Sequence, residues 1–250
     1  MALMRTANPA LNDDTFSRIG YAAVDEDRMT LQGTVNKTGL MLLALVAGAA
    51  YTWSLFLEGN MGSLMMWMMA GVIGGLIVSF VTVFKKEWSP VTAPLYAVLE
   101  GFALGGISAV LNESYPGIAL QAVALTFGIA GSLLLAYKSG VIKATENFKL
   151  GLFAAMGGIF LIYLAGFILS FFGIGIPYIH ESGLIGIGFS LVVVTVAALN
   201  LVLDFDFIEK GAEMGAPKYM EWYAAFGLMV TLVWLYIEIL RLLSKLNSRK

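Results

Sequence analysis

Cysteine is absent from the 250-residue sequence, and histidine occurs only once. The absence of cysteine excludes disulfides, thiolate metal sites and iron–sulfur clusters. The sequence also lacks a phosphate-binding or dinucleotide-binding glycine loop, a Ser/His/Asp set and a histidine cluster with metal spacing. Lys and Arg number 15 against 17 Asp and Glu, and the net charge of −2 argues against a basic nucleic-acid-binding surface. We therefore expect no enzyme, no cofactor and no nucleic-acid partner.

Charged residues are scarce, and apolar residues dominate. The sequence is 59% hydrophobic and 13% charged, whereas soluble domains have about 45–50% apolar and about 25% charged residues. Seven transmembrane helices of about 20 residues would take about 140 and leave about 110 for loops and tails. No segment alternates with the period of a barrel strand, so we expect an all-α membrane protein with seven transmembrane helices. The expected spans are Thr38–Leu57, Ser63–Phe84, Val91–Leu111, Pro116–Tyr137, Leu150–Phe172, Gly183–Phe207 and Tyr219–Leu246.

The first 37 residues are mixed in charge and contain no apolar run long enough for a secretory signal. We expect residues 1–37 to be a cytoplasmic N-terminal arm and residues 38–250 to form a seven-helix membrane domain. Cytoplasmic loops carry an excess of Lys and Arg. Here these residues lie in the arm and in the second, fourth and sixth loops: Arg5, Arg18, Arg28, Lys37, Lys85, Lys86, Lys138, Lys143, Lys149, Lys210 and Lys218. The N-terminus is therefore expected in the cytoplasm.

The last span leaves two alternatives open. Seven spans place the C-terminus outside, yet the tail carries several basic residues, including Arg241 and Lys245. The last helix is either a full span or a re-entrant segment. We expect the full span, because charges near the C-terminal end of a chain usually influence topology less. Within the spans, the pairs Gly71/Gly75 and Gly101/Gly105 have a spacing that lets helices approach closely. A compact monomeric bundle is the simplest expectation.

Ionisable side chains within a span are costly and mark functional candidates. Three carboxylates on three spans stand out: Glu100 in the third, Asp204 near the cytoplasmic end of the sixth, and Glu238 deep in the seventh. Glu100 lies roughly 13 Å from the inner edge of its span at the helical rise, which is near mid-membrane. The residues expected to support these acids are Asn200, Asp206 and Arg241.

Neighbouring carboxylates in a dry interior cannot all stay ionised, because burial and like charge both disfavour the charged form. Two acids sharing a proton would hold their helices together and repel each other after losing it, as a pH-sensitive latch. Ionised, they would suit calcium, a hard cation with oxygen ligands. Three structural interpretations stay open: Glu238 with Arg241 as a stabilising pair within one helix, Asp206 as a solvated helix end, and Glu100 in an interhelical hydrogen bond.

Three motifs occur in order along the spans: YAVLEG around Glu100, LVLDFDFI around Asp204, and WLYIEILRLL around Glu238. With them, residues 38–246 resemble the Bax inhibitor/YccA family, the transmembrane Bax-inhibitor-motif proteins. The family usually reads Leu-Tyr-Leu-Asp where this chain has Leu-Tyr-Ile-Glu at 235–238. The N-terminal NPALNDDTF resembles a bacterial branch of the family.

The resemblance implies a seven-helix bundle with the last helix central, and an acidic pair that senses pH and gates a calcium leak. Position by position, this pair is Asp204 and Glu238, which would also bind the passing calcium. Counting residues from the ends of their spans, at the helical rise, places the two carboxyls at depths that differ by about 10 Å along the membrane normal. Glu100 is therefore an alternative partner for Glu238.

The expected function is a pH-sensitive calcium leak channel of the bacterial inner membrane, with calcium as the permeant ion. One alternative is a non-conducting regulator that binds a membrane protease or a translocon through residues 1–37. Another is a proton-coupled transporter of a small solute, which would use the same acids.

Overall fold

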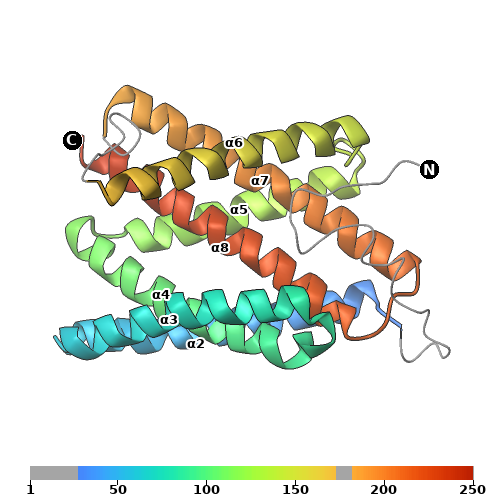
Figure 1. Ribbon diagram of the computed structural model, residues 1–250, viewed down its shortest axis with the longest axis horizontal. Helices are drawn as coiled ribbons and strands as arrows, with labels where there is room; N and C mark the ends of the chain where they lie inside the picture. Colours follow the sequence, from blue (N-terminus) through green and yellow to red (C-terminus); the bar gives the residue numbers. More distant parts are fainter. Residues whose placement is uncertain (1–27, 173–181, 250) are drawn as a thin grey trace.

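The computed structural model of the chain describes residues 28–172 and 182–249. Long α-helices joined by short connections make up this part of the chain, and a single 3-10 turn precedes α4 (Figure 1). The elements are α2 (Leu31–Leu57), α3 (Met61–Phe84), η2 (Lys86–Trp88), α4 (Ser89–Ser114), α5 (Ile118–Lys138), α6 (Glu146–Ser170), α7 (Leu184–Glu213) and α8 (Met220–Asn247). Seven helices in the described ranges are long and apolar enough to cross a membrane. The predicted all-α fold class is confirmed.

The first helix begins earlier than its hydropathy predicts. It starts at Leu31 rather than Thr38, because the Thr30 hydroxyl caps it by accepting a hydrogen bond from the backbone N–H of Gly33 at 2.9 Å. The last ten residues of the expected arm therefore belong to the described structure, and residues 1–27 lie outside the described ranges. Polar residues can extend a helix beyond its apolar stretch when a cap satisfies its first N–H groups.

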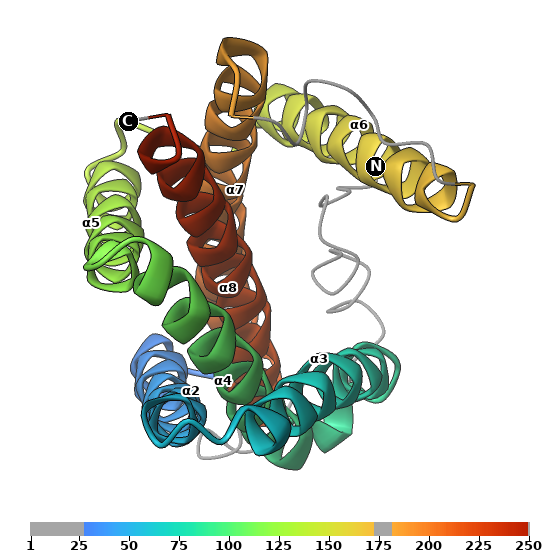
Figure 2. The ribbon, with the colours of Figure 1, turned by 90° about the vertical axis from the view of Figure 1, so that its left-hand side faces the viewer.

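The last helix lies at the centre of the bundle. Figure 2 shows α8 in the middle, with α7 behind it and α5, α4 and α2 to one side, and α8 packs against all four. One buried cluster joins the first half of α8 to α2 and α4. A second joins its second half to α5 and α7. The predicted central position of the last helix is confirmed.

Glycines bring α2, α3 and α4 together, as their spacing predicts. A Cβ atom at Gly101 or Gly105 would overlap with the backbone of α2, at Leu45 and Ala49 respectively. A Cβ atom at Gly71 would lie 2.5 Å from the carbonyl oxygen of Leu99 on α4. Close backbone approach requires small residues at such crossings.

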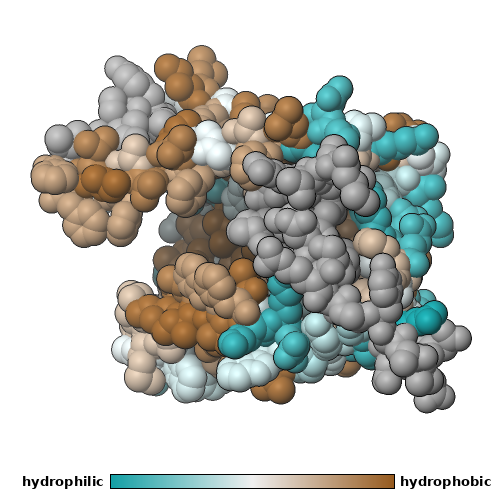
Figure 3. All heavy atoms as spheres, turned by 45° about the vertical axis from the view of Figure 1, so that its right-hand side comes forward, coloured by the Kyte–Doolittle hydropathy of each residue, from teal (hydrophilic) through white to brown (hydrophobic). Residues whose placement is uncertain are grey.

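The two ends of the bundle differ in polarity. On the face drawn in Figure 3, hydrophilic side chains gather toward the right-hand end and hydrophobic ones toward the left. The connections at 85–88, 139–145 and 214–219 lie at the same end as the start of α2, because successive helices run in opposite directions. The lysine-bearing loops of the sequence are thus brought together at one end. α8 is a single continuous helix, with the geometry of a full span rather than of a re-entrant hairpin.

Candidate functional site

Asp204 is fully buried on α7 between its own helix and α8. Its polar neighbours are Asn200, one turn earlier, and Thr231 on α8. The Asn200 amide donates to the Thr231 hydroxyl at 3.0 Å, and this hydroxyl is directed to the carbonyl of Gly227 at 3.4 Å. Neither carboxyl oxygen of Asp204 accepts a hydrogen bond of regular geometry in the described structure, although the Thr231 hydroxyl lies beside the carboxyl. The amide oxygen of Asn200 also has no hydrogen-bond partner in the described structure.

Three unpartnered oxygens at one buried helix contact are unusual. Most buried polar atoms in proteins are hydrogen-bonded, and an unsatisfied one costs about 1–3 kcal/mol, more when charged. Apolar residues of the same size would remove this cost. The arrangement is therefore a candidate for a function that needs free oxygen ligands or a proton-binding group.

Glu238, on α8, has a complete set of partners. Arg241, three residues later on the same helix, donates to both carboxylate oxygens, at 2.9 and 3.2 Å. The hydroxyl of Tyr163 on α6 donates to Glu238 at 3.1 Å and accepts a hydrogen bond from Arg241 at 2.6 Å. The expected pair within one helix is thus formed, and Tyr163 extends it across to α6.

The structure does not join Asp204 to Glu238. α7 and α8 are antiparallel, and Asn200 contacts Thr231. At a rise of 1.5 Å per residue, Asp204 lies about 6 Å from this contact toward one end and Glu238 about 10 Å toward the other. The two carboxyls are therefore about 16 Å apart along the helix axes, a larger offset than the depth count predicts.

Glu100 lies in a different part of the bundle. It is half-buried on α4, beside Tyr96 of the same helix and against Gly75 of α3, where a Cβ atom would lie 3.0 Å from its carboxylate oxygen. Glu238 is instead directed to α6 through Tyr163. Of the three predicted acids, then, none hydrogen-bonds to another: Asp204 has no partner, and Glu100 and Glu238 have their own neighbours.

Asp206 is not the solvated helix end that one interpretation of the sequence predicts. Its carboxylate forms ion pairs with Lys210 at 2.7 Å and with Lys149 of α6 at 3.2 Å. The Lys149 side chain is buried. Because a buried ammonium group needs a counter-charge, Asp206 holds the start of α6 against the end of α7.

No group of three or more His, Asp or Glu side chains in residues 28–172 and 182–249 is placed to hold a metal ion. A calcium ion bound at once by Asp204 and Glu238 does not fit their separation.

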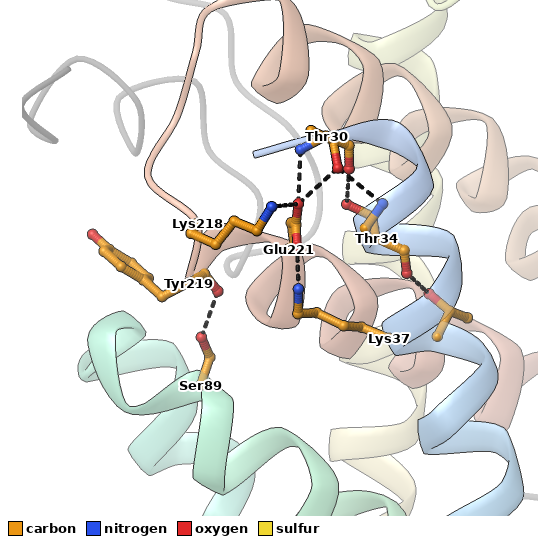
Figure 4. Close-up of polar contacts among 9 residues, drawn as sticks. Thr30, Thr34, Lys37, Ser89, Lys218, Tyr219 and Glu221 are labelled. Atoms are coloured by element: carbon orange, nitrogen blue, oxygen red, sulfur yellow. Dashed lines mark hydrogen bonds and ion pairs between the residues drawn. The ribbon is translucent and has the colours of Figure 1, made fainter. Parts of the chain in front are cut away.

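A third buried carboxylate, Glu221, escaped the sequence analysis. It is fully buried in the first turn of α8. Figure 4 shows it between Thr30, Lys37 and Lys218. Its oxygens accept hydrogen bonds from the backbone N–H and hydroxyl of Thr30, both at 2.9 Å, and form ion pairs with Lys37 and, at 3.3 Å, with Lys218. We call Glu221, Thr30, Lys37 and Lys218 the α2–α8 clamp.

The chain before α2 adds to this clamp. The backbone N–H of Met29 donates to the carbonyl of Ala216 at 2.6 Å, and Arg28 and Pro217 form an isolated β-bridge. The only sequence signal for these contacts is an acidic residue in the first turn of the last helix, which favours a helix N-terminus without naming a partner.

Comparison of the whole chain with known protein families agrees with this seven-helix architecture. Searches among curated proteins and solved structures gave no significant match. The family model described as Bax inhibitor 1 like matches residues 8–248, which includes all seven helices. The chain belongs to the Bax inhibitor 1-like family of multi-pass membrane proteins.

Proposed function

We propose that this protein is a pH-sensitive calcium leak channel of the bacterial inner membrane, with its N-terminus in the cytoplasm. The observation that carries the proposal is the buried carboxyl of Asp204, whose oxygens have no hydrogen-bond partner in the described structure. In a bundle of seven candidate spans, an intramembrane acid without a partner is typical of an ion or proton pathway.

The ligands for a cation come from two helices. Asp204 and Asn200 on α7 offer unpartnered oxygens, and Thr231 on α8 offers its hydroxyl oxygen. Calcium prefers such hard oxygen ligands and takes about six to eight of them. Water would supply the rest, so this set suits a passing ion better than a resident one.

Protonation of Asp204 would control the passage. A protonated carboxyl has no charge to attract a cation, and its O–H can donate a hydrogen bond to the amide oxygen of Asn200, one turn earlier on α7. Loss of the proton leaves a buried negative charge that favours cation entry. Three other acids on these helices are engaged elsewhere: Asp206 with two lysines, Glu221 with Lys37 and Lys218, and Glu238 with Arg241. Calcium flux is therefore expected to rise as pH rises through the titration of Asp204.

Glu238 acts at a second position along the path. Its separation from Asp204 means that a cation would meet the two acids in succession. Since Arg241 neutralises Glu238 in this structure, conduction requires the contact of Glu238, Arg241 and Tyr163 between α8 and α6 to rearrange.

Calcium flux into liposomes at two pH values tests the proposal. Asp204→Asn is expected to abolish the pH dependence, and Glu238→Gln to change flux at both pH values. Glu213→Gln, an exposed position at the end of α7, is the control and should behave as the unmodified protein. Unchanged pH profiles in both Asp204→Asn and Glu238→Gln would exclude this mechanism.

Deleting residues 1–27 separates the channel from the alternative regulator. This deletion keeps Met29, Thr30 and Lys37, which anchor α2. A channel retains its flux without the segment. A regulator that binds a membrane protease or translocon through its arm loses its partner and shows no flux in either form.

A further inference from the structure

An apolar groove opens on the side of the bundle between α2 and α5. Figure 2 shows these two helices on the same side of α8, with α4 crossing between them. The groove has a volume of about 410 Å³, and α4 and α8 also line it. It lies away from Asp204 and Glu238, which do not line it.

The three hydroxyl groups in the groove wall, of Ser108, Thr126 and Tyr236, are already hydrogen-bonded. The Ser108 and Tyr236 hydroxyls form a hydrogen bond with each other at 2.7 Å. The Thr126 hydroxyl donates to the carbonyl of Ala122, in its own helix, at 2.8 Å. A water molecule needs about two to four polar partners, and apolar cavities of about 150 Å³ remain dry and bind small apolar molecules instead. The hydroxyl groups of this larger groove are not free to bind water, so an apolar occupant is expected.

The groove is continuous with the surface that faces the lipid. Its rim includes Val46 on α2 and Leu120 on α5, whose side chains are 59% and 75% exposed. Both helices are candidate membrane spans, so these exposed apolar rims lie in the hydrocarbon of the bilayer. The groove therefore opens to lipid chains rather than to water or to a soluble ligand.

We propose that this groove between α2 and α5 holds one acyl chain of a membrane phospholipid. The headgroup remains outside, because the hydroxyl groups of the groove wall are already hydrogen-bonded and the rest of the lining is almost entirely apolar. A chain bound there fills space that the side chains leave open, and dispersion contacts with the walls favour it over a chain in the free bilayer.

The bound acyl chain would contact α8 on the face opposite Glu238. Helical geometry turns about 100° per residue, so Met229, Val233 and Tyr236 share one face of α8, and all three line the groove. Thr231 and Glu238 lie on the opposite face by the same geometry. The lipid and the buried polar contacts with α7 and α6 thus occupy two sides of one helix.

Native mass spectrometry of the full chain, purified from a phospholipid membrane and exchanged through detergent, tests the inference. The unmodified protein is expected to retain one phospholipid. Val123→Trp fills the groove from α5 and should lower the lipid-bound fraction at least tenfold. Val72→Trp, the same change on the lipid-exposed face of α3, is the control and should retain the lipid.

A second groove-filling variant, Ala49→Leu on α2, covers the case in which Val123→Trp does not fold, as judged by its helical circular dichroism. It should also lose the phospholipid. The inference is overturned if the unmodified protein retains no phospholipid, if it retains only detergent, or if a folded groove-filling variant retains as much phospholipid as Val72→Trp does.

Discussion

Two buried carboxylates, Glu221 and Asp204, show how the same chemical group can stabilise a fold or prepare it for function. Glu221 has a lysine on each side and two hydrogen bonds from Thr30. Asp204 is equally buried, and its oxygens have no partner in the described residues. Burial of a charge is tolerated when partners compensate its lost hydration. Glu221 therefore has the environment of a structural anchor, and Asp204 does not.

The first prediction concerns the space beside Glu221. A Cβ atom at Gly33 would overlap with the Glu221 carboxylate. Gly33→Ala should therefore displace the carboxylate and lower the free energy of unfolding by about 1–3 kcal/mol. Gly39→Ala lies on the same helix, where a Cβ atom meets nothing within 4 Å, and should be neutral or stabilising by up to about 1 kcal/mol. Unfolding in detergent, followed by circular dichroism, compares the two; equal stability would contradict the clamp.

The two lysines of the clamp should differ in their contribution. The Lys37 side chain is 16% exposed, whereas that of Lys218 is 48% exposed. Lys37→Met leaves the buried Glu221 without its main counter-charge and should cost about 3 kcal/mol. Lys218→Met removes a solvent-screened pair and should cost under about 1 kcal/mol. The same unfolding measurement ranks them, and a larger loss for Lys218→Met would refute this assignment.

At this scale, the sequence predicted Asp204, Glu100 and Glu238 as acids within spans, and the pairing of Glu238 with Arg241. It did not predict the role of Glu221 or the partners that lie on other helices. Depth and apolar flanks identify Asp204 and Glu238 without knowledge of the fold. Each of Glu238 and Glu221 also has a partner from a distant part of the chain: Tyr163 is 75 residues from Glu238, and Thr30 is 191 residues from Glu221. Such contacts depend on helix order around α8, which no local pattern encodes.

At the scale of the helix, all seven spans follow from hydropathy, while several helix ends do not. α7 continues past its apolar stretch to Glu213. The ion pair between Asp206 and Lys210, one turn apart, joins the end of the apolar stretch to this extension and supports it as other pairs at this spacing do. Hydropathy reports how much of a helix meets lipid, whereas caps and ion pairs determine where it ends.

The crossing of α2 and α4 gives the third prediction. A Cβ atom at Gly105 would overlap with the backbone of Ala49. Gly105→Ala should therefore push the two helices apart and lower stability by about 1–3 kcal/mol, as overpacking does. Gly131→Ala on α5, where a Cβ atom meets nothing within 4 Å, is the matched control. A thermal melt in detergent should show a lower midpoint for Gly105→Ala alone; two equal midpoints would show that the crossing tolerates a methyl group.

At the scale of the whole molecule, α8 connects two packing units. Its first half belongs to the cluster with α2 and α4, and its second half to the cluster with α5 and α7. A chain ending at Glu213 should therefore lose its defined packing and elute from size exclusion as a broad, aggregated peak. A chain ending at Asn247, which keeps α8 whole, should elute as the full chain does. A sharp monomeric peak for the shorter chain would show that α2–α7 pack without α8.

The central helix α8 follows α2–α7 along the chain. Since translation proceeds from the N-terminus, the six earlier helices enter the bilayer before the element that joins them exists. A chain cut short before α8 thus leaves open to lipid the apolar faces of α2, α4, α5 and α7 that α8 covers.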